Sequence, residues 1–302
     1  MPSLCGELTP AQAEWYEVNS GPSSRNACRV RAGNSCGSGS LVGQYQNGSL
    51  VLTNAHVVGS KVGTNATCQF AFGGTEVTKT GRIIIAGYST RVTADWAILL
   101  IPDWQPVSPV WCSRIRPTGE DRFYTTGSPQ CVWPLRHQSQ LRLISNNNAG
   151  FAVWDKPAIG GQSGSGVWNH ATHFQQLLLT WRTGNNNGAG QPLDYIWSQG
   201  QAAMETGVLS GGAMPDGLVP LSDVNPDAEE GFFCEASIRS LPIWAEDQKP
   251  EPEPEPGLPI SKAQLIESYR KIEVEAKSMI SRLEGASDVP KDPPKDGPTF
   301  GL

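Results

Sequence analysis

Short apolar runs separated by turn-forming residues fill the first 181 residues of the chain. Gly, Asn, Ser and Pro divide these runs, and no sustained 3.6-residue periodicity appears among them. Short runs bounded by turn residues are typical of antiparallel strands, whereas a parallel sheet needs crossover helices. We therefore expect an all-β fold built from antiparallel barrels or sandwiches. The expected strands are 49–53, 69–72, 82–86, 96–101, 141–144, 166–168 and 175–181.

One short helix is expected after these strands. Residues 193–205 read LDYIWSQGQAAME, and they predict a helix that closes the β region. The predicted domain spans 24–205 and follows an N-terminal extension of residues 1–23. From 206 to 248 the sequence shows no strand or helix pattern, and we expect an irregular segment there.

The last part of the chain has a different composition. Residues 249–258 contain PEPEPEP, and alternating proline favours an extended polyproline rod that holds its two ends roughly 20 Å apart. In 259–286, Ser261 and Gln264 form a capping box and Gly285 supplies a stop, so this segment predicts a helix. The final residues, 287–302, are rich in Pro, Lys and Asp and are expected to be disordered.

The predicted helix at 259–286 carries a heptad pattern, which is typical of a coiled coil. A single helix of this length is marginal in water, so it needs a surface on which to pack. The helix would fold back onto the β domain, self-associate as a coiled coil, or dock on a partner. The sequence does not decide among these three alternatives. The heptad positions are Leu265, Tyr269, Ile272, Ala276, Met279 and Leu283.

Charge is spread unevenly and excludes some classes of protein. From residue 221 on, the last 82 positions hold 17 of the 29 acidic and 9 of the 23 basic residues. A net charge of −6 without a Lys/Arg cluster argues against nucleic-acid binding as the main role. No run approaches the roughly 20 apolar residues of a membrane span, and the start lacks the pattern of a signal peptide. We therefore expect an intracellular or virion-associated protein rather than a secreted one.

The seven cysteines point to thiols rather than to a metal site. None of them forms a CxxC pair, which argues against structural zinc. An odd number without a signal peptide favours reduced, partly buried thiols, although some pairing stays open. We expect no metal and no organic cofactor. The cysteines are Cys5, Cys28, Cys36, Cys68, Cys112, Cys131 and Cys234.

Three short segments carry the residue types of nucleophilic catalysis in the order His, Asp, Ser. They are LTNAHVV with His56, ADWAIL with Asp95, and GGQSGSG with Ser163. A hydroxyl attacks a carbonyl at neutral pH only when a base takes its proton, and the base needs a group that fixes its tautomer. His, with a reference pKa of about 6.5, suits the base, and a glycine-flanked Ser suits the nucleophile. Each segment alone also has an ordinary structural reading as a core histidine, a strand-edge aspartate or a tight turn.

Together the three segments resemble the trypsin-like serine proteases of the chymotrypsin-fold superfamily. TNAHVV is typical of the HtrA-like branch, and the resemblance runs from the GSGS at 37–40 to Trp181, about half of the chain. It implies two antiparallel β-barrels with the active site in the cleft between them, and a closing C-terminal helix. Because 206–248 is too short for a PDZ domain, the resemblance covers the catalytic half only.

The resemblance also assigns catalytic roles. It makes His56 the general base, Asp95 the carboxylate that orients it, and Ser163 the nucleophile. The backbone N–H groups of Gly161 and Ser163 would form the oxyanion hole. The residue before the nucleophile is Gln162 where zymogen-activated trypsins carry Asp, so activation through a newly cut N-terminus is not expected.

Substrate binding is expected along one strand. Residues 178–181 resemble the strand whose backbone pairs with an extended substrate peptide, which makes Thr180, Trp181 and Arg182 the candidate substrate-binding residues. Thr180 would also lie near the buried Asp95. The resemblance defines no further specificity pocket.

The sequence therefore predicts a serine endopeptidase that acts on a protein or peptide through an acyl-enzyme. The alternative is a catalytically inactive binding or scaffold protein with a protease fold, tethered by its C-terminal helix. An α/β-hydrolase is excluded because position 165 is Ser rather than Gly and because that family places its His well downstream of the Ser.

Overall fold

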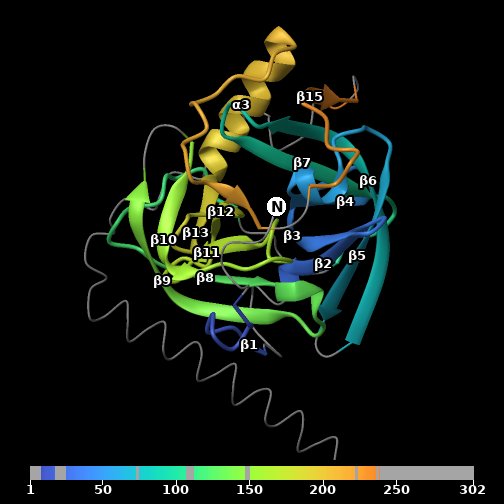
Figure 1. Cartoon of the computed structure of the whole chain (residues 1–302). Coiled ribbons are helices and arrows are strands. Elements are labelled where there is room, and N and C mark those ends of the chain that lie inside the picture. The colour runs from blue at the N-terminus through green and yellow to red at the C-terminus, as the bar shows by residue number, and fades with distance from the viewer. Residues whose placement is uncertain are drawn as a thin grey trace, which may run out of the picture. The chain divides into compact units, whose positions relative to one another are not determined.

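Antiparallel strands make up most of the regular structure. The computed structural model describes residues 8–17, 25–72, 75–106, 112–146, 150–221, 224–235 and 238. The strands fall into two sheets that lie side by side, one built mainly from strands before residue 102 and the other mainly from strands after residue 121 (Figure 1). The predicted linker, heptad helix and C-terminal tail lie outside the described residues.

The first sheet closes on itself as a barrel of six strands. Each strand pairs with its neighbours in the order β6–β5–β2–β3–β4–β7, and β7 pairs again with β6. The strands are β2 (Ala27–Ala32), β3 (Ser35–Tyr45), β4 (Gly48–Thr53), β5 (Asn65–Phe72), β6 (Thr75–Ser89) and β7 (Ala94–Ile101).

Strands β4 and β7 are buried along their whole length, as their continuous apolar sequences GSLVLT and ADWAILLI imply. Side chains alternate between the two faces of a strand. Val51 and Leu99 therefore belong to the apolar cluster of the first barrel, whereas Leu50 and Ile98 belong to a second cluster shared with the C-terminal helix.

The second sheet closes in the same way. Its pairings run β9–β10–β13–β12–β11–β8, and β8 pairs again with β9. The strands are β8 (Arg122–Gly127), β9 (Arg136–Asn146), β10 (Ala152–Pro157), β11 (Gly166–Asn169), β12 (Gln175–Arg182) and β13 (Asn187–Pro192). The structure thus confirms the expected all-β architecture of two antiparallel barrels.

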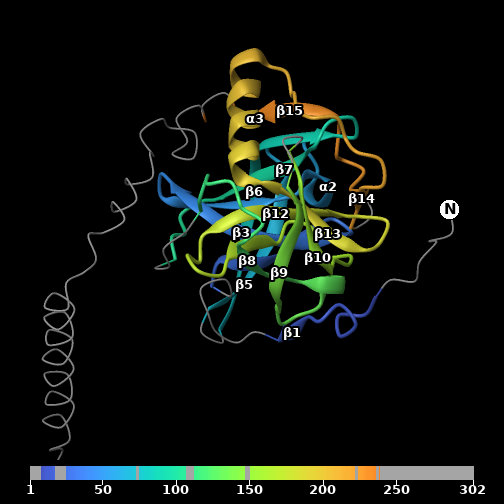
Figure 2. The same cartoon turned by 90° about the vertical axis from the view of Figure 1, so that its left-hand side faces the viewer.

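The expected helix is present as α3 (Leu193–Thr206). Asp194 in its first turn complements the helix dipole, and Gly207 ends it with a left-handed φ of 73°, as glycine often does. Trp96 Nε1 of the first barrel donates to Gln199 Oε1 at 2.8 Å, which fixes the helix against that barrel. Figure 2 shows α3 standing beside the strands of both sheets.

The segment 206–248, expected to be irregular, contains two short strands. They are β14 (Val219–Pro220), which pairs with β12, and β15 (Gly231–Cys234), which pairs with β6. Neither strand shows an alternation of apolar and polar residues that would have predicted it. Each forms because it pairs with the edge of a neighbouring strand.

The first described residues pack on the second barrel. Strand β1 (Tyr16–Glu17) pairs with β9, and Trp15 is buried in a small apolar cluster with Ile159. Lys156 of β10 forms an ion pair with Glu14. Part of the expected N-terminal extension is therefore integrated into the fold.

A disulfide corrects the expectation of reduced cysteines. Cys36 at the start of β3 is bonded to Cys131 in the short helix η1 (Pro129–Cys131), with Cα atoms 6.0 Å apart. The bond joins the first barrel to the second, a proximity that cysteine spacing does not reveal. Four described cysteines are free thiols; burial raises the pKa of Cys28 and raises that of Cys112 to about 12, so both are protonated at neutral pH.

The described residues contain no helix that is long and apolar enough to cross a membrane. They also contain no group of three His, Cys, Asp or Glu side chains arranged to hold a metal ion.

Candidate active site

His56 lies in a one-turn helix, α2 (Ala55–Val58), directly after β4. All four residues of the turn are buried, and Gly59 ends it with a φ of 86°, a value that favours glycine. The backbone N–H of His56 donates to Asp95 Oδ1 at 3.0 Å. This bond fixes the position of the turn relative to β7.

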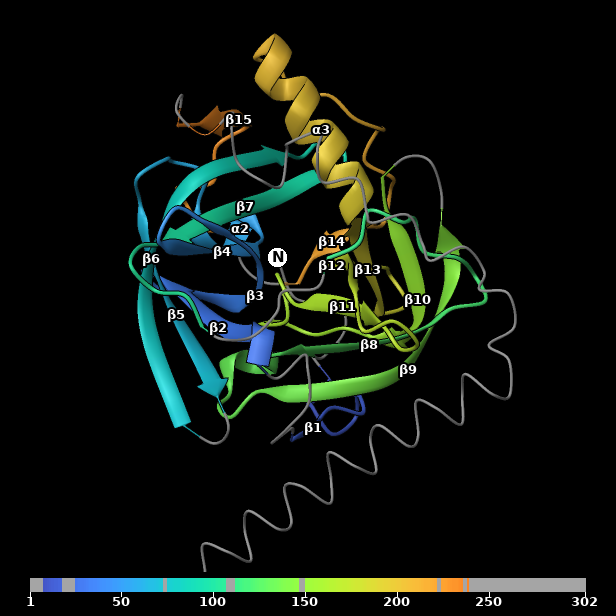
Figure 3. The same ribbon diagram turned by 180° about the vertical axis from the view of Figure 1, so that it is seen from behind.

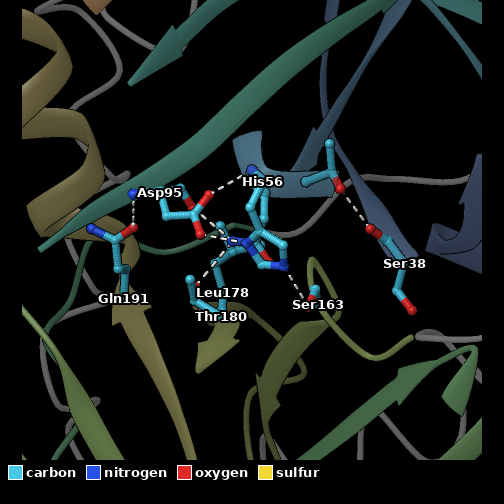
Figure 4. Close-up of polar contacts among 9 residues, drawn as sticks. Ser38, His56, Asp95, Ser163, Leu178, Thr180 and Gln191 are labelled. Atoms are coloured by element: carbon cyan, nitrogen blue, oxygen red, sulfur yellow. Dashed lines mark hydrogen bonds and ion pairs between the residues drawn. The ribbon is translucent and has the colours of Figure 1, made fainter. Parts of the chain in front are cut away.

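Three residues that are far apart in sequence form one hydrogen-bonded chain (Figure 4). His56 Nδ1 lies 2.5 Å from Asp95 Oδ2, and His56 Nε2 lies 2.8 Å from Ser163 Oγ. His56 and Ser163 are fully buried, and Asp95 is 1% exposed. The structure therefore brings together the three residues that the sequence predicts as nucleophile, base and orienting carboxylate.

The charge of Asp95 also acts on a neighbouring tyrosine. Tyr88 of β6 is the strand partner of Asp95, and it is nearly buried. Burial and the negative charge of Asp95 raise the pKa of Tyr88 to about 12. Tyr88 is therefore a neutral phenol at physiological pH.

Ser163 lies in a glycine turn between β10 and β11. Gly161 and Gly164 have φ values of 82° and 86°, which side-chain-bearing residues rarely adopt. A Cβ at Gly161 would lie 2.5 Å from the carbonyl oxygen of Ser128. The side chain of Gln162 turns back, where its Oε1 accepts the N–H of Ile159 at 2.9 Å.

Ser38 of β3 holds the turn from the first barrel. Its hydroxyl donates to the carbonyl oxygen of Gly161 at 2.9 Å, and its N–H donates to the carbonyl oxygen of Ser163 at 2.7 Å. The hydroxyl also accepts the N–H of Ser128 at 2.8 Å. Both predicted oxyanion-hole residues are thus held by one serine of the GSGS segment.

Two supporting residues were not predicted from the sequence. Asn54 Nδ2 donates to the carbonyl oxygen of Asp95 at 2.6 Å and to Thr180 Oγ1 at 3.0 Å. Gln191 of β13 accepts the N–H of Asp95 on its Oε1 at 3.0 Å. Thr180 thus reaches the aspartate through Asn54. Only the position of Asn54 inside TNAHVV could have signalled a role.

The remaining candidate substrate-binding residues lie on β12 beside the site. Trp181 is buried and Arg182 is half-buried. Both pair with β13 on one side and with β14 of the same chain on the other. The strand edge that the sequence predicts for a substrate is therefore occupied by residues 219–220.

One family model and several solved structures are similar to this chain. The family model described as a trypsin-like peptidase domain matches residues 37–174. The serine endoprotease from Yersinia pestis is 15% identical, with 63% of this chain and 69% of that chain covered and a TM-score of 0.49. The active form of the Rv3671c protease from M. tuberculosis is 16% identical, with 59% of this chain and 80% of that chain covered and a TM-score of 0.44. No curated protein sequence matches the chain significantly.

The family match spans the strands from β3 to β11 and includes the turn of His56, the start of β7 and the turn of Ser163. Residues 37–174, just under half of the chain, are therefore similar to a trypsin-like peptidase domain.

Proposed function

We propose that the protein is a serine endopeptidase with Ser163 as nucleophile, His56 as general base and Asp95 as the orienting carboxylate. The observation that carries the proposal is the hydrogen-bonded chain from Ser163 Oγ through the His56 ring to Asp95 Oδ2, with contacts of 2.8 and 2.5 Å. A nucleophile within hydrogen-bond reach of a base, with the base held by a third group, is the arrangement that activates a hydroxyl.

The reaction has two halves. Ser163 Oγ attacks the scissile carbonyl carbon while His56 Nε2 takes its proton, and His56 then returns the proton to the leaving amine. The acyl-enzyme that remains is hydrolysed by water along the same path. The N–H groups of Gly161 and Ser163 stabilise the oxyanion, an effect that is strong where water is excluded.

Asp95 suits the role of orienting group because it is itself fixed. Its Oδ1 accepts the N–H of His56, so the carboxylate holds both the backbone and the ring of the base. Asn54 and Gln191 bind the backbone of Asp95 on either side. A carboxylate held this way favours one histidine tautomer and stabilises the imidazolium formed during the reaction.

A fluorophosphonate probe tests the proposal because it reacts only with an activated serine. We expect the wild-type protein to gain one label at Ser163 and Ser163→Ala to gain none. Ser165→Ala is the matched control, since Ser165 is also buried, lies in the same turn and takes no part in the proposed reaction. A folded wild-type protein that neither takes the label nor cleaves any peptide would instead be the binding or scaffold protein considered above.

A further inference from the structure

One edge of strand β12 is covered along its second half by strand β14, a later segment of the same chain. On one side β12 pairs with β13 over 177–182. On the other side β11 pairs only with its first half, from Gln175 to Leu178. Beyond that point Trp181 pairs with Pro220 and Arg182 pairs with Val219, antiparallel, through β14 (Figure 3).

Under the proposed function, this half of β12 is where a substrate would bind. An extended peptide adds to an exposed strand edge through main-chain hydrogen bonds, and pockets select its side chains. Trp181 and Arg182 are the residues predicted for that contact. Strand β14 therefore lies where the backbone of a substrate would bind, and it runs antiparallel to β12 as that backbone would.

The direction of β14 carries the chain toward the nucleophile. Leu179 of β12 is bound to the turn of Ser163: its N–H donates to the carbonyl oxygen of Ser165 at 2.9 Å, and its carbonyl oxygen accepts the N–H of Gly164 at 2.8 Å. Because the pairing with β14 is antiparallel, the step from Val219 to Pro220 moves from Arg182 to Trp181. Continued by one residue, this register would bring Leu221 opposite Thr180, the residue that follows Leu179.

The side chains of this segment behave like those of a bound peptide. Leu221 is 2% exposed and belongs to the apolar cluster of the second barrel, which includes Ala158, five residues before Ser163. Val219, two residues before Leu221, is 46% exposed. Leu218 packs against the cluster of Trp181.

The chain is anchored again at the turn of His56. Asn225 is buried; its N–H donates to the carbonyl oxygen of His56 at 2.8 Å, and its Nδ2 donates to that of Val57 at 3.0 Å. The carbonyl oxygen of Asp227 accepts the N–H of Ser60 at 3.1 Å. The chain is thus paired with β12 at residues 219–220 and hydrogen-bonded to the His56 turn at Asn225, and His56 and Ser163 are both fully buried.

We infer that the protein is its own substrate and cuts its chain on the carboxyl side of Leu221. The inference rests on the proposed function and adds a substrate class, a peptide with an apolar residue, here leucine, at the position before the cut. The register of β14, the burial of Leu221 and the anchor at Asn225 carry it together.

The step is an ordinary hydrolysis. Ser163 Oγ attacks the carbonyl carbon of Leu221, and its proton passes through His56 to the nitrogen of Ser222 as the C–N bond breaks. Water then cleaves the ester, which leaves a carboxylate on Leu221 and a new amino terminus at Ser222. Atoms balance with one water consumed, and no oxidant or cofactor takes part.

Intact mass spectrometry of the full chain over time tests the inference. We expect the wild type to convert into fragments 1–221 and 222–302, and Ser163→Ala to stay whole. The conversion should be first-order with a rate that does not depend on protein concentration. Inactive Ser163→Ala chains mixed with wild type should stay whole, because their own segment already fills their site.

Two substitutions that lie two residues apart, one at a buried side chain and one at an exposed side chain, separate recognition of the cleavage site from nonspecific damage. Leu221→Asp places a charge in an apolar cluster and should abolish the cut, while Val219→Asp changes an exposed side chain and should leave it. Thermal unfolding of both variants shows whether they fold. If Leu221→Asp does not fold, Leu221→Gly serves in its place and should slow the cut at least tenfold.

The outcomes distinguish the inference from the function on which it rests. If the wild type remains whole while the fluorophosphonate labels Ser163, either in the wild type or in Leu221→Asp, self-cleavage is overturned. The proposed peptidase activity is then still supported. A cut at another position, or one that persists in Ser163→Ala, also overturns self-cleavage after Leu221. A folded protein that takes no label in any variant and stays whole overturns both.

Discussion

At the scale of single residues, Asn54 connects three parts of the site. One amide group binds the backbone of Asp95 on β7 and the hydroxyl of Thr180 on β12, while the residue itself precedes the His56 turn. It is fully buried, so no water replaces these bonds when they are lost. Asn54 is a positioning residue that acts through the aspartate.

Asn54→Ala should therefore impair catalysis more than binding. We expect kcat to fall at least tenfold with little change in KM, and the free energy of unfolding to fall by about 1–3 kcal/mol, since two buried acceptors lose their donor. Steady-state kinetics on a peptide and urea denaturation measure the two effects. Thr180→Val removes only one of the two bonds and should have the smaller effect on kcat; an unchanged kcat in Asn54→Ala would show that Asn54 only fills space.

At the scale of elements, the turn that carries Ser163 depends on glycine. Gly164 has a φ of 86°, and a Cβ there would lie 2.1 Å from the carbonyl oxygen of Ser38. Gly63 has nearly the same φ, 87°, but nothing lies within 4 Å of the position where its Cβ would be. The two glycines thus share one backbone conformation and differ in their surroundings.

Gly164→Ala should destabilise the fold and abolish labelling of Ser163. Backbone strain alone costs about 1–3 kcal/mol, and the contact with Ser38 adds to it because neither backbone can move freely. Gly63→Ala carries the strain without the contact and should keep wild-type labelling. Thermal unfolding and probe labelling of the two variants compare them directly; equal behaviour would mean that the turn tolerates a side chain.

The sequence predicts a strand or helix well when the apolar residues of that element are the ones that pack it into the core. Strands β4 and β7 and the helix α3 were predicted because their apolar residues recur with the right spacing. Strand β13, NGAGQP, was missed because it contains almost no strand-forming residues. Its glycines are required by its neighbours, since a Cβ at Gly188 would lie 2.3 Å from Trp154 Nε1.

The residues of the candidate site also divide into those that the sequence could predict and those that it could not. His56, Asp95 and Ser163 were predicted because the chemistry fixes their residue types and their order along the chain. Gln191 was not, since a glutamine that binds a backbone N–H has no local sequence signature. The cover over β12 could not be predicted either, because it depends on a pairing between Pro220 and Trp181 that only the folded chain brings about.

At the scale of the whole molecule, the bond between Cys36 and Cys131 joins the two barrels next to the nucleophile turn. The double variant Cys36→Ser/Cys131→Ser should lose about 2–4 kcal/mol of unfolding free energy, the usual contribution of such a link. Urea denaturation with and without reductant measures it: the reductant should weaken the wild type and leave the double variant unchanged. A wild type that is insensitive to reductant would show that the thiols are not joined in solution.

The heptad pattern of residues 259–286 lies outside the described residues, and its role stays a prediction. If it drives self-association, full-length protein should sediment as an oligomer, and Ile272→Glu/Met279→Glu should return it to the monomer mass because charges disrupt an apolar seam. Lys271→Glu, outside the heptad positions, is the control. A monomeric wild type would leave docking on the body or on a partner.

The disulfide also makes breaks in the chain distinguishable by their position. The bond encloses residues 36–131 in a covalent loop. A nick inside that loop leaves both pieces joined until a reductant opens the bond, whereas a break after Leu221 lies outside it and frees the C-terminal piece at once. Denaturing gels run with and without reductant therefore separate accidental nicking of the first barrel from processing near β14.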